Sequence, residues 1–424
     1  MALATTTNWE VRTTGAADNG GGFDPVLGAS ATDYSQQDAA ELSLSDGETS
    51  GIASADLISD TGGFTAAMVG NVLYLASGTN ATVGYYQIVA YTDTNTVTLD
   101  RAPDDTVGGL TGDAVFKVGG AIDTPQTIID IGSGIDTIWI KKGDYTAETI
   151  VAVSINITGY DTTRGDNPIA FANMPTFLTA QLWSGDVISN IACDGGGFNI
   201  SSAEAKNCYA KNALIGYEGS RGVLIDCVAD GCDSGFDIVL SELIRCRATG
   251  GAVGYNLVGY QCFYIGCTAD TNTSYGWYAI GDADGTFFGC IAYSNAGTGF
   301  YTTCGKFNNC ISYDNDIGFQ LVGLSNERPI AIFNCVASSN TNEGFYLGAE
   351  ILEDPANNVY FDYNCSYNNG TDYKLWGTFS TDANNFETNP LFVNAATGDF
   401  RLQSGSPCLN TGIPQSPLRG GEVI

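Results

Sequence analysis

The residues that could carry chemistry in this chain are acidic, aromatic and amide side chains, because its 424 residues include no histidine. Serine–histidine hydrolysis, cysteine–histidine proteolysis, histidine-ligated zinc and any imidazole base are therefore excluded. Acidic residues outnumber basic ones 47 to 16, which gives a formal net charge of -31. Such a charge repels nucleic acid and anionic membranes, so we expect neither as a partner.

One set of polar and aromatic residues recurs along the second half of the chain, each directly after a glycine–aromatic pair or, in the eighth copy, after Asp372-Tyr373. The set is Glu218, Asp237, Asn256, Tyr278, Tyr301, Gln320, Tyr346 and Lys374. In a β-strand, the residue after an inward-facing aromatic faces outward, so we expect one exposed stripe. Tyrosine can pack its ring on a sugar and also form hydrogen bonds. The predicted glycan-binding residues are Tyr278, Tyr301, Gln320, Tyr346, Glu218 and Asp237; a subunit interface and a plain solvent-exposed face are the alternative interpretations.

This stripe belongs to an internal repeat in which a cysteine is followed two residues later by a small residue. The repeated cysteines are Cys208, Cys227, Cys246, Cys267, Cys290, Cys310 and Cys335, with Cys365 as a degenerate eighth copy. An aromatic follows each glycine of the repeat, at Tyr217, Phe236, Tyr255, Trp277, Phe300, Phe319 and Phe345. The spacing between cysteines varies from 19 to 30 residues. Such variation is typical of a solenoid whose loops differ in length while its strands stay the same.

The repeat predicts which side chains face the interior. The cysteines and the small residues hardly vary in size, whereas the residue between them ranges from Arg247 to Ile291 and, in the eighth copy, Ser366. We therefore expect the cysteines in one buried ladder, with the intervening residue outside. Asn, Asp or Gly stands before most of the cysteines, which favours a left-handed bend there. Parallel Cβ vectors on neighbouring coils would hold the Cβ atoms slightly too far apart for a disulfide, so we expect free thiols. The sequence contains no C-x-x-C pair of the kind that binds a metal.

Two segments resemble right-handed parallel β-helix proteins of the pectin-lyase-like superfamily. The segment 389–412, NPLFVNAATGDFRLQSGSPCLNTG, is similar to the closing pattern D-P-L-F-V-x-x-x-x-G-D-F-R-L-x-x-G-S-P-A-x-D-x-G, with Cys408 in place of alanine and Asn410 in place of aspartate. The segment 135–145, IDTIWIKKGDY, is similar to the opening pattern G-D-T-I-x-V-x-x-G-x-Y. The resemblance implies an all-β, right-handed parallel β-helix over 121–412, with the closing segment at 386–412 and a tail at 413–424.

The first 120 residues differ in texture and predict a small β-rich module. Strand-like runs occur at 72–75, 85–91 and 96–99, with a turn at 93–96, and a short helix is expected within 34–60. The stretches at 8–15 and 33–38 resemble the N-termini of β-helix proteins found in phage and environmental sequences. This resemblance implies that residues 1–120 form an attachment region.

The rigid solenoid, the missing secretory signal, the free thiols expected of assembly in the cytosol and the lack of an assembled catalytic motif give a first functional hypothesis. We expect a structural or receptor-binding component of a phage particle, such as a tailspike, fibre or capsid appendage. The N-terminus has no basic segment followed by an apolar one, so no secretory signal is expected, and assembly would take place in the host cytoplasm before incorporation into the virion. The expected partners are other virion proteins and a host surface glycan, and a homotrimer is expected, without membrane insertion.

Two alternatives use the same scaffold: a polysaccharide lyase or glycoside hydrolase, and a bacterial surface adhesin. The resemblance to pectate lyases leaves calcium as the one ion to consider, and no other cofactor is expected. Its carboxylates would have to come from one of three clusters in the turns. These are Asp230, Asp233 and Asp237; Asp282 and Asp284; and Asp314 and Asp316.

Overall fold

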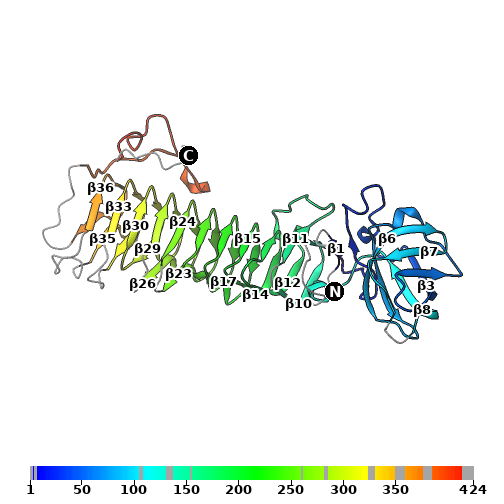
Figure 1. The fold of residues 1–424 in the computed structure, drawn as a ribbon. Helices are drawn as coiled ribbons and strands as arrows, with labels where there is room; N and C mark the ends of the chain where they lie inside the picture. Colours follow the sequence, from blue (N-terminus) through cyan, green and yellow to red (C-terminus); the bar gives the residue numbers. More distant parts are fainter. Residues whose placement is uncertain are drawn as a thin grey trace. The chain divides into compact units, whose positions relative to one another are not determined.

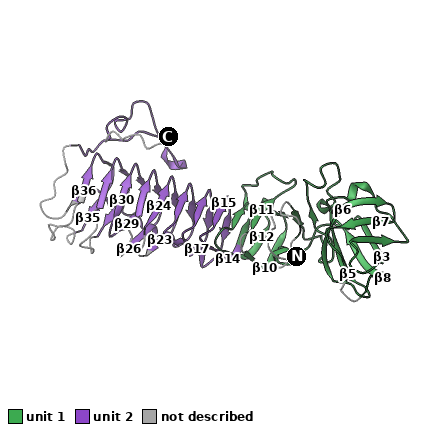
Figure 2. Cartoon of the chain, viewed as in Figure 1, with its two compact units in different colours: residues 1–193 green, residues 194–424 purple. Residues whose placement is uncertain are grey.

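The protein is an all-β chain that combines a parallel β-helix with a small antiparallel barrel, as the sequence predicts (Figure 1). The computed structural model describes residues 3, 7–104, 108–129, 137–152, 155–258, 261–280, 285–322, 330–348, 359–375 and 384–412. The chain forms two compact units, residues 1–193 and 194–424 (Figure 2). No helix in the described part is long and apolar enough to cross a membrane.

The first unit contains a closed barrel of six antiparallel strands in the order β3-β4-β7-β6-β5-β8. The strands are β3 (Leu42–Thr49), β4 (Asp56–Ser59), β5 (Val72–Ser77), β6 (Gly84–Asp93), β7 (Thr96–Leu99) and β8 (Thr111–Val118). The predicted strands at 72–75, 85–91 and 96–99 are confirmed. The prediction of a helix within 34–60 is wrong: the segment contains only a 3-10 turn at Tyr34–Gln36. The later part of it forms barrel strands, and alternate residues of β4 point into the barrel, with Leu57 in its core.

The first unit also holds the opening coils of the β-helix. They are built from β9 (Thr137–Lys141), β10 (Asp144–Ala152), β11 (Asn156–Tyr160), β12 (Thr176–Leu182) and β13 (Val187–Ser189). A strand from the very start of the chain, β1 (Asn8–Val11), pairs in parallel with β9, and β2 (Gly22–Phe23) pairs with β1. Trp9 and Val11 are buried on the inner side of β1. Residues 8–11 therefore extend the β-helical sheet, and within 1–120 the barrel accounts for 42–118.

In the second unit each coil contributes strands to three faces, which Figure 1 shows stacked in succession. The first face consists of β15 (Glu204–Lys206), β18 (Val223–Ile225), β21 (Glu242–Ile244), β24 (Cys262–Ile265), β27 (Gly285–Phe288), β30 (Gly305–Asn308), β33 (Ile330–Phe333) and β36 (Val359–Asp362). The second face consists of β16 (Tyr209–Lys211), β19 (Val228–Asp230), β22 (Arg247–Thr249), β25 (Thr268–Asp270), β28 (Ile291–Tyr293), β31 (Ile311–Tyr313), β34 (Val336–Ser338) and β37 (Cys365–Tyr367). The third face consists of β14 (Ala192–Ser201), β17 (Ile215–Ser220), β20 (Ser234–Val239), β23 (Val253–Val258), β26 (Tyr275–Ile280), β29 (Thr298–Thr302), β32 (Phe319–Leu321), β35 (Glu343–Leu347) and β38 (Thr371–Leu375).

The cysteine ladder is confirmed. The seven repeated cysteines are buried free thiols that directly precede the second-face strands. Their sulfurs donate to main-chain carbonyls; Cys246, for example, donates to Leu224 O at 3.4 Å in the preceding coil. The residue before each cysteine adopts positive φ, as predicted for Asn207 and Asp226, and Arg245 does the same. Burial raises the pKa of Cys246 and Cys290, so these thiols stay protonated.

The predicted aromatic stack is also confirmed, and it continues from Phe198 to Tyr373. Successive rings lie parallel, with centroids 4.8 Å apart for Tyr217 and Phe236 and 4.7 Å apart for Phe300 and Phe319. A glycine precedes every ring of the stack except Tyr373, and this glycine faces inward as well. A Cβ at Gly276 would lie 2.6 Å from the carbonyl oxygen of Gly299 in the next coil, so no larger residue fits there. This inward glycine interrupts the alternation, so the residue before it faces outward, as Tyr275 does before Gly276.

The eighth copy corrects one detail of the predicted phase. Cys365 pairs in register with Val336 and Ser366 with Ala337, so Ser366 faces inward and Cys365 takes the intervening position. Asn364 occupies the ladder position instead: its Oδ1 accepts from Cys335 N at 3.0 Å and its Nδ2 donates to Ile332 O at 3.0 Å. The left-handed bend falls on Tyr363.

A ladder of asparagines, buried except for the half-buried Asn369, runs beside the later coils. It consists of Asn272, Asn295, Asn315, Asn340 and Asn369. Each side-chain oxygen after the first accepts from the main-chain N–H and the side-chain amide of the preceding member, as Asn315 does for Asn295 at 2.9 Å in both cases. These bonds give the main-chain N–H groups at the bends between the second and third faces a hydrogen-bond partner.

The closing segment folds back over the second face. Its hairpin consists of β39 (Phe392–Asn394) and β40 (Asp399–Leu402). The ring of Phe400 lies 5.4 Å from that of Tyr293 and 5.5 Å from that of Tyr313. The same segment meets the last coil where the Cys365 sulfur donates to Thr388 O at 3.1 Å. The predicted tail at 413–424 lies outside the described residues.

Candidate functional site

The predicted outward stripe lies on the third face as two in-register runs of side chains. In-register pairs run from Asn199 through Glu218 to Asp237, and from Asn256 through Tyr278, Tyr301, Gln320 and Tyr346 to Lys374. A hydrogen bond from Asn256 Nδ2 to Asp237 Oδ2 at 3.0 Å joins the two parts. All of these side chains are partly or fully exposed. The structure therefore brings the predicted site residues into one row, while their role in binding stays a prediction.

The centre of the stripe is a cluster of three tyrosines. The rings of Tyr278 and Tyr301 stack with centroids 5.2 Å apart and planes 22° apart. Tyr275 lies 4.9 Å from Tyr278 and 5.5 Å from Tyr301, tilted against both. Because the first two rings face each other, a sugar can reach their edges, their hydroxyl ends and the outer ring faces, but not the space between them.

Sequence reasoning missed Tyr275, because it precedes the glycine–aromatic pair and strict alternation from the inward Trp277 would turn it inward. The inward-facing Gly276 shifts the alternation, so Tyr275 and Tyr278 both emerge on the outer surface. The signal was the inward glycine itself, which recurs in the first seven copies of the repeat.

The two ends of the stripe differ in charge. At one end, Glu218 and Asp237 each accept from the amide of a neighbour, Asn199 Nδ2 at 2.9 Å and Asn256 Nδ2 at 3.0 Å. At the other end, the Lys374 ammonium lies 4.9 Å from the centre of the Tyr346 ring and 2.6 Å from a Glu343 oxygen. A hydrogen bond from Lys374 to Glu343 raises the pKa of the lysine. The amide of Gln320 accepts from the Thr298 hydroxyl at 3.0 Å.

The acidic clusters considered for calcium are dispersed in the described part of the chain. Asp314 accepts from the Ser294 hydroxyl at 2.9 Å, and Asp316 from the Asn342 amide at 2.7 Å. Asp230 accepts from the Tyr209 hydroxyl at 2.7 Å. Among the described residues, no three His, Cys, Asp or Glu side chains form a group able to hold a metal ion. Asp282 and Asp284 lie outside those residues.

A second polar cluster, which the sequence did not indicate, lies on the second face. Asp270 is 2% exposed, and Arg247 donates to both of its oxygens at 2.7 and 2.8 Å. The Thr249 hydroxyl donates to the same carboxylate at 2.9 Å. Burial and the Asp230 carboxylate raise the pKa of Tyr209 to about 12, so this phenol stays a donor. The oxygens of Asp270 are already occupied, which suits a structural ion pair better than proton transfer to a substrate.

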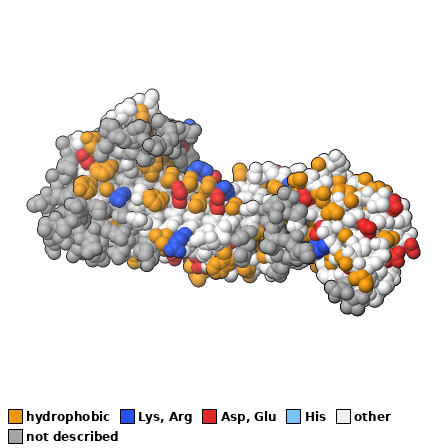
Figure 3. Space-filling view, in the orientation of Figure 1, with side chains coloured by type: hydrophobic (Ala, Val, Ile, Leu, Met, Phe, Trp, Pro, Cys, Tyr) orange, Lys and Arg blue, Asp and Glu red, His pale blue; other side chains and the backbone are white. Residues whose placement is uncertain are grey.

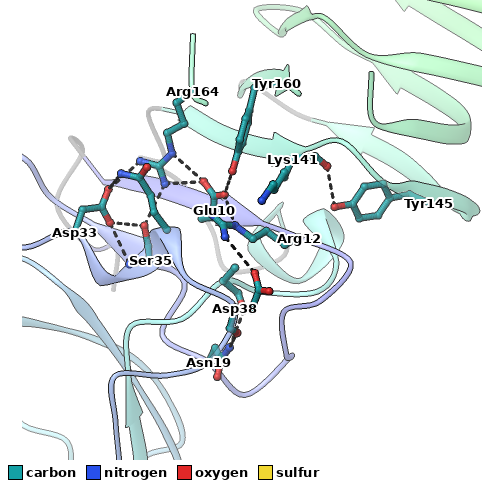
Figure 4. Close-up of polar contacts among 12 residues, drawn as sticks. Glu10, Arg12, Asn19, Asp33, Ser35, Asp38, Lys141, Tyr145, Tyr160 and Arg164 are labelled. Atoms are coloured by element: carbon teal, nitrogen blue, oxygen red, sulfur yellow. Dashed lines mark hydrogen bonds and ion pairs between the residues drawn. The ribbon is translucent and has the colours of Figure 1, made fainter. Parts of the chain in front are cut away.

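The first unit holds a buried ionic network around Glu10 (Figure 4). Arg12 Nε donates to Glu10 Oε1 at 2.7 Å, Arg164 Nε donates to Oε2 at 2.8 Å, and Tyr160 donates its hydroxyl. Arg164 also reaches Asp33 at 2.9 Å. A fully buried carboxylate is tolerated only with such partners. The network therefore fixes β1 against the opening coils and leaves no oxygen of Glu10 for a ligand.

Comparison with known proteins finds no matching family model and no matching curated protein. Among solved structures, a GH87 alpha-1,3-glucanase catalytic domain in complex with tetrasaccharides is similar at 12% identity over 83% of this chain and 99% of that chain, with a TM-score of 0.41. The catalytic unit of a thermostable GH87 alpha-1,3-glucanase from Streptomyces thermodiastaticus strain HF3-3 is similar at 10% identity over 82% and 88%, with a TM-score of 0.40. The tailspike protein gp49 from Pseudomonas phage LKA1 is similar at 9% identity over 78% and 63%, with a TM-score of 0.18.

Proposed function

We propose that this protein is a glycan-binding β-helix protein whose ligand lies along the outward stripe of the third face. The observation that supports the proposal is the cluster of Tyr275, Tyr278 and Tyr301, three partly exposed rings in mutual contact over two neighbouring coils. Amphipathic rings with hydroxyl ends suit a sugar, which has both apolar faces and hydroxyl groups. The amide and carboxylate groups on either side of the cluster extend the row of hydrogen-bonding partners.

The geometry of the stripe favours an extended ligand. Adjacent strands of a sheet lie about 4.8 Å apart, so the row of side chains follows the axis of the coils in small, equal steps. A net charge of -31 opposes a polyanion. Glu218 and Asp237 add local negative charge at one end of the row. The proposed ligand is therefore a neutral polysaccharide, or an acidic one only where calcium bridges the charges.

The biological setting that we propose is a phage particle, in which this chain would serve as a receptor-binding tailspike, fibre or capsid appendage. The resemblance of the N-terminal stretches to phage β-helix proteins supports this setting. Immunogold electron microscopy of particles and of host cells tests it: label on virions supports the phage role, and label confined to cell envelopes supports the adhesin alternative.

Glycan binding is tested by isothermal titration or a glycan array with Tyr301→Ala. Loss of a central aromatic contact should weaken binding by about 1–3 kcal/mol, roughly 5- to 150-fold in Kd, with an unchanged melting temperature. Tyr367→Ala is the matched control, because Tyr367 is 36% exposed but lies on the second face. Equal loss in both variants, or in neither, contradicts the proposed site.

The same panel of polysaccharides distinguishes binding from catalysis. Reducing-end and 235-nm absorbance assays on the unmodified chain would detect a hydrolase or a lyase. If the chain releases product and Tyr301→Ala releases it at the same rate, the functional site lies outside the stripe.

A further inference from the structure

The outward side of the first face is unusually apolar for a solvent-facing sheet. Its strands alternate, so the middle residue of each triplet is buried and the two flanking residues face outward. The outward residues include Val223, Ile225, Ile244, Phe263, Ile265, Phe288, Ala331, Phe333 and Tyr360. Phe263 is 53% exposed, Tyr360 52% and Ile265 36%. Figure 3 shows hydrophobic side chains gathered over this region of the second unit.

Charge on this face is nearly balanced, in contrast to the chain as a whole. Its outward positions carry two lysines, Lys206 and Lys306, and three carboxylates, Glu204, Glu242 and Asp362. At the neighbouring corner, Arg245 forms a bidentate pair with Asp226 at 2.7 Å. A chain with net charge -31 repels its own copies over most of its surface. This face is therefore one where two copies could approach without strong repulsion.

The order of these charges indicates how two copies would meet. The eight strands of the face run in order from β15 to β36. Consider a two-fold axis that is parallel to the strands and passes midway between β24 and β27. It would place the first strand of one copy opposite the last strand of the other, the second opposite the seventh, and so on. Under this operation Glu242 on β21 faces Lys306 on β30. Lys206 on β15 likewise faces Asp362 on β36.

Six of the nine apolar residues meet one another under the same operation, whereas Phe263, Ile244 and Tyr360 face Thr286, Asn308 and Glu204. Ile265 on β24 faces Phe288 on β27, and Ile225 on β18 faces Phe333 on β33. Equal strand spacing of about 4.8 Å keeps the two copies in step along the face, and the pairing of opposite charges at two places favours a second copy as the partner. We propose that the first face is a self-association surface on which two copies of this chain pack in antiparallel order.

The size of the face sets the strength of this association. Eight strands at about 4.8 Å spacing span roughly 34 Å, and strands of three to four residues are about 10 Å wide. Such an area lies below the roughly 800 Å² per partner of a standard stable interface. The pair should therefore be reversible, and its population should depend on protein concentration.

Sedimentation velocity of the full chain over a wide range of concentration tests the proposal. We expect a monomer–dimer equilibrium that Ile265→Lys shifts at least tenfold toward monomer, with an unchanged melting temperature. Leu214→Lys is the matched control, because Leu214 is 72% exposed but lies outside the first face. A monomer at every concentration, a trimer, or equal effects of the two lysine variants would overturn the proposal.

A charge exchange tests the antiparallel order. Lys306→Glu should weaken the dimer by placing a carboxylate opposite Glu242 of the second copy. Adding Glu242→Lys should restore it, although the two positions are three strands apart within one chain and do not touch. Lack of rescue would overturn the antiparallel register. The stripe lies on another face, so glycan binding by the same variants reports on the proposed function separately.

Discussion

Asn315 shows what a single buried amide contributes to this solenoid. Its Nδ2 donates to Ala292 O at 3.0 Å and to the Ser312 hydroxyl at 2.9 Å, and its Oδ1 accepts two bonds from Asn295. Alanine at this position would leave several buried groups without partners, each at a cost of about 1–3 kcal/mol. We expect Asn315→Ala to lower the free energy of unfolding by about 3–5 kcal/mol in denaturant titrations.

Asn342→Ala is the control for this prediction. Asn342 is exposed and its amide donates only to Asp316 among the described contacts, at 2.7 Å. Its removal should change stability by no more than about 0.5 kcal/mol, as for most surface substitutions. Similar losses in both variants would mean that the buried ladder contributes nothing beyond ordinary side-chain contacts.

The thiols give a second prediction at the residue scale. Twelve of the thirteen cysteines are buried, and Cys408 is partly exposed in the closing segment. Cys408 is the one cysteine that is not fully buried, and its side-chain hydrogen bond with Cys365 lowers its pKa, so a reagent in solution can reach it more readily than the buried thiols. We expect native labelling to modify Cys408 alone, and Cys408→Ser to abolish that labelling.

The same pair should respond to an added disulfide. Oxidised glutathione can take two electrons from Cys365 and Cys408, which lose two protons and form one bond, while two glutathione thiols are released. Peptide mapping should find this cross-link and no cross-link within the ladder. Rapid labelling of several ladder cysteines would contradict the burial on which both expectations depend.

The sequence contained more information about single residues than simple pattern reading extracts. Asparagine stands five residues after Cys267, Cys290, Cys310 and Cys335, at the positions of the buried ladder. Asn369 stands five residues after Asn364, not after Cys365, and this spacing indicates that Asn364 holds the eighth ladder position. Cys365 was placed in the ladder because its residue type matches the other copies. The spacing to the following asparagine shows instead that Asn364 holds the ladder position.

At the scale of elements, repetition made the strands predictable. The cysteine ladder, the aromatic stack and the outward stripe all follow from alternation counted from one recurring pair, because neighbouring coils must superimpose. Pairings between distant parts of the chain leave no such periodic trace. The parallel pairing of β1 with β9 and the packing of Phe400 on Tyr293 depend on tertiary contacts alone. The Tyr275 position was missed for a related reason, since the inward glycine shifts the alternation within one strand.

At the scale of the whole solenoid, stability should be local, because each coil contacts only its neighbours. Phe319 stacks between Phe300 and Phe345, at centroid distances of 4.7 and 4.9 Å, in the middle of the second unit. Phe319→Ala removes a buried ring and leaves a cavity, which should cost about 3–5 kcal/mol.

Hydrogen exchange can show how far that loss spreads. In a solenoid, coils are coupled mainly through nearest-neighbour interfaces. Amides of β29, β32 and β35 should therefore exchange faster in Phe319→Ala, while those of β17 and β20 keep their protection. Gln320→Ala, which changes the adjacent outward residue of the same strand, should leave all five strands unchanged. If Phe319→Ala instead accelerated every strand by one common factor, the second unit would unfold as a single cooperative body, and the aromatic stack would transmit stability along its full length.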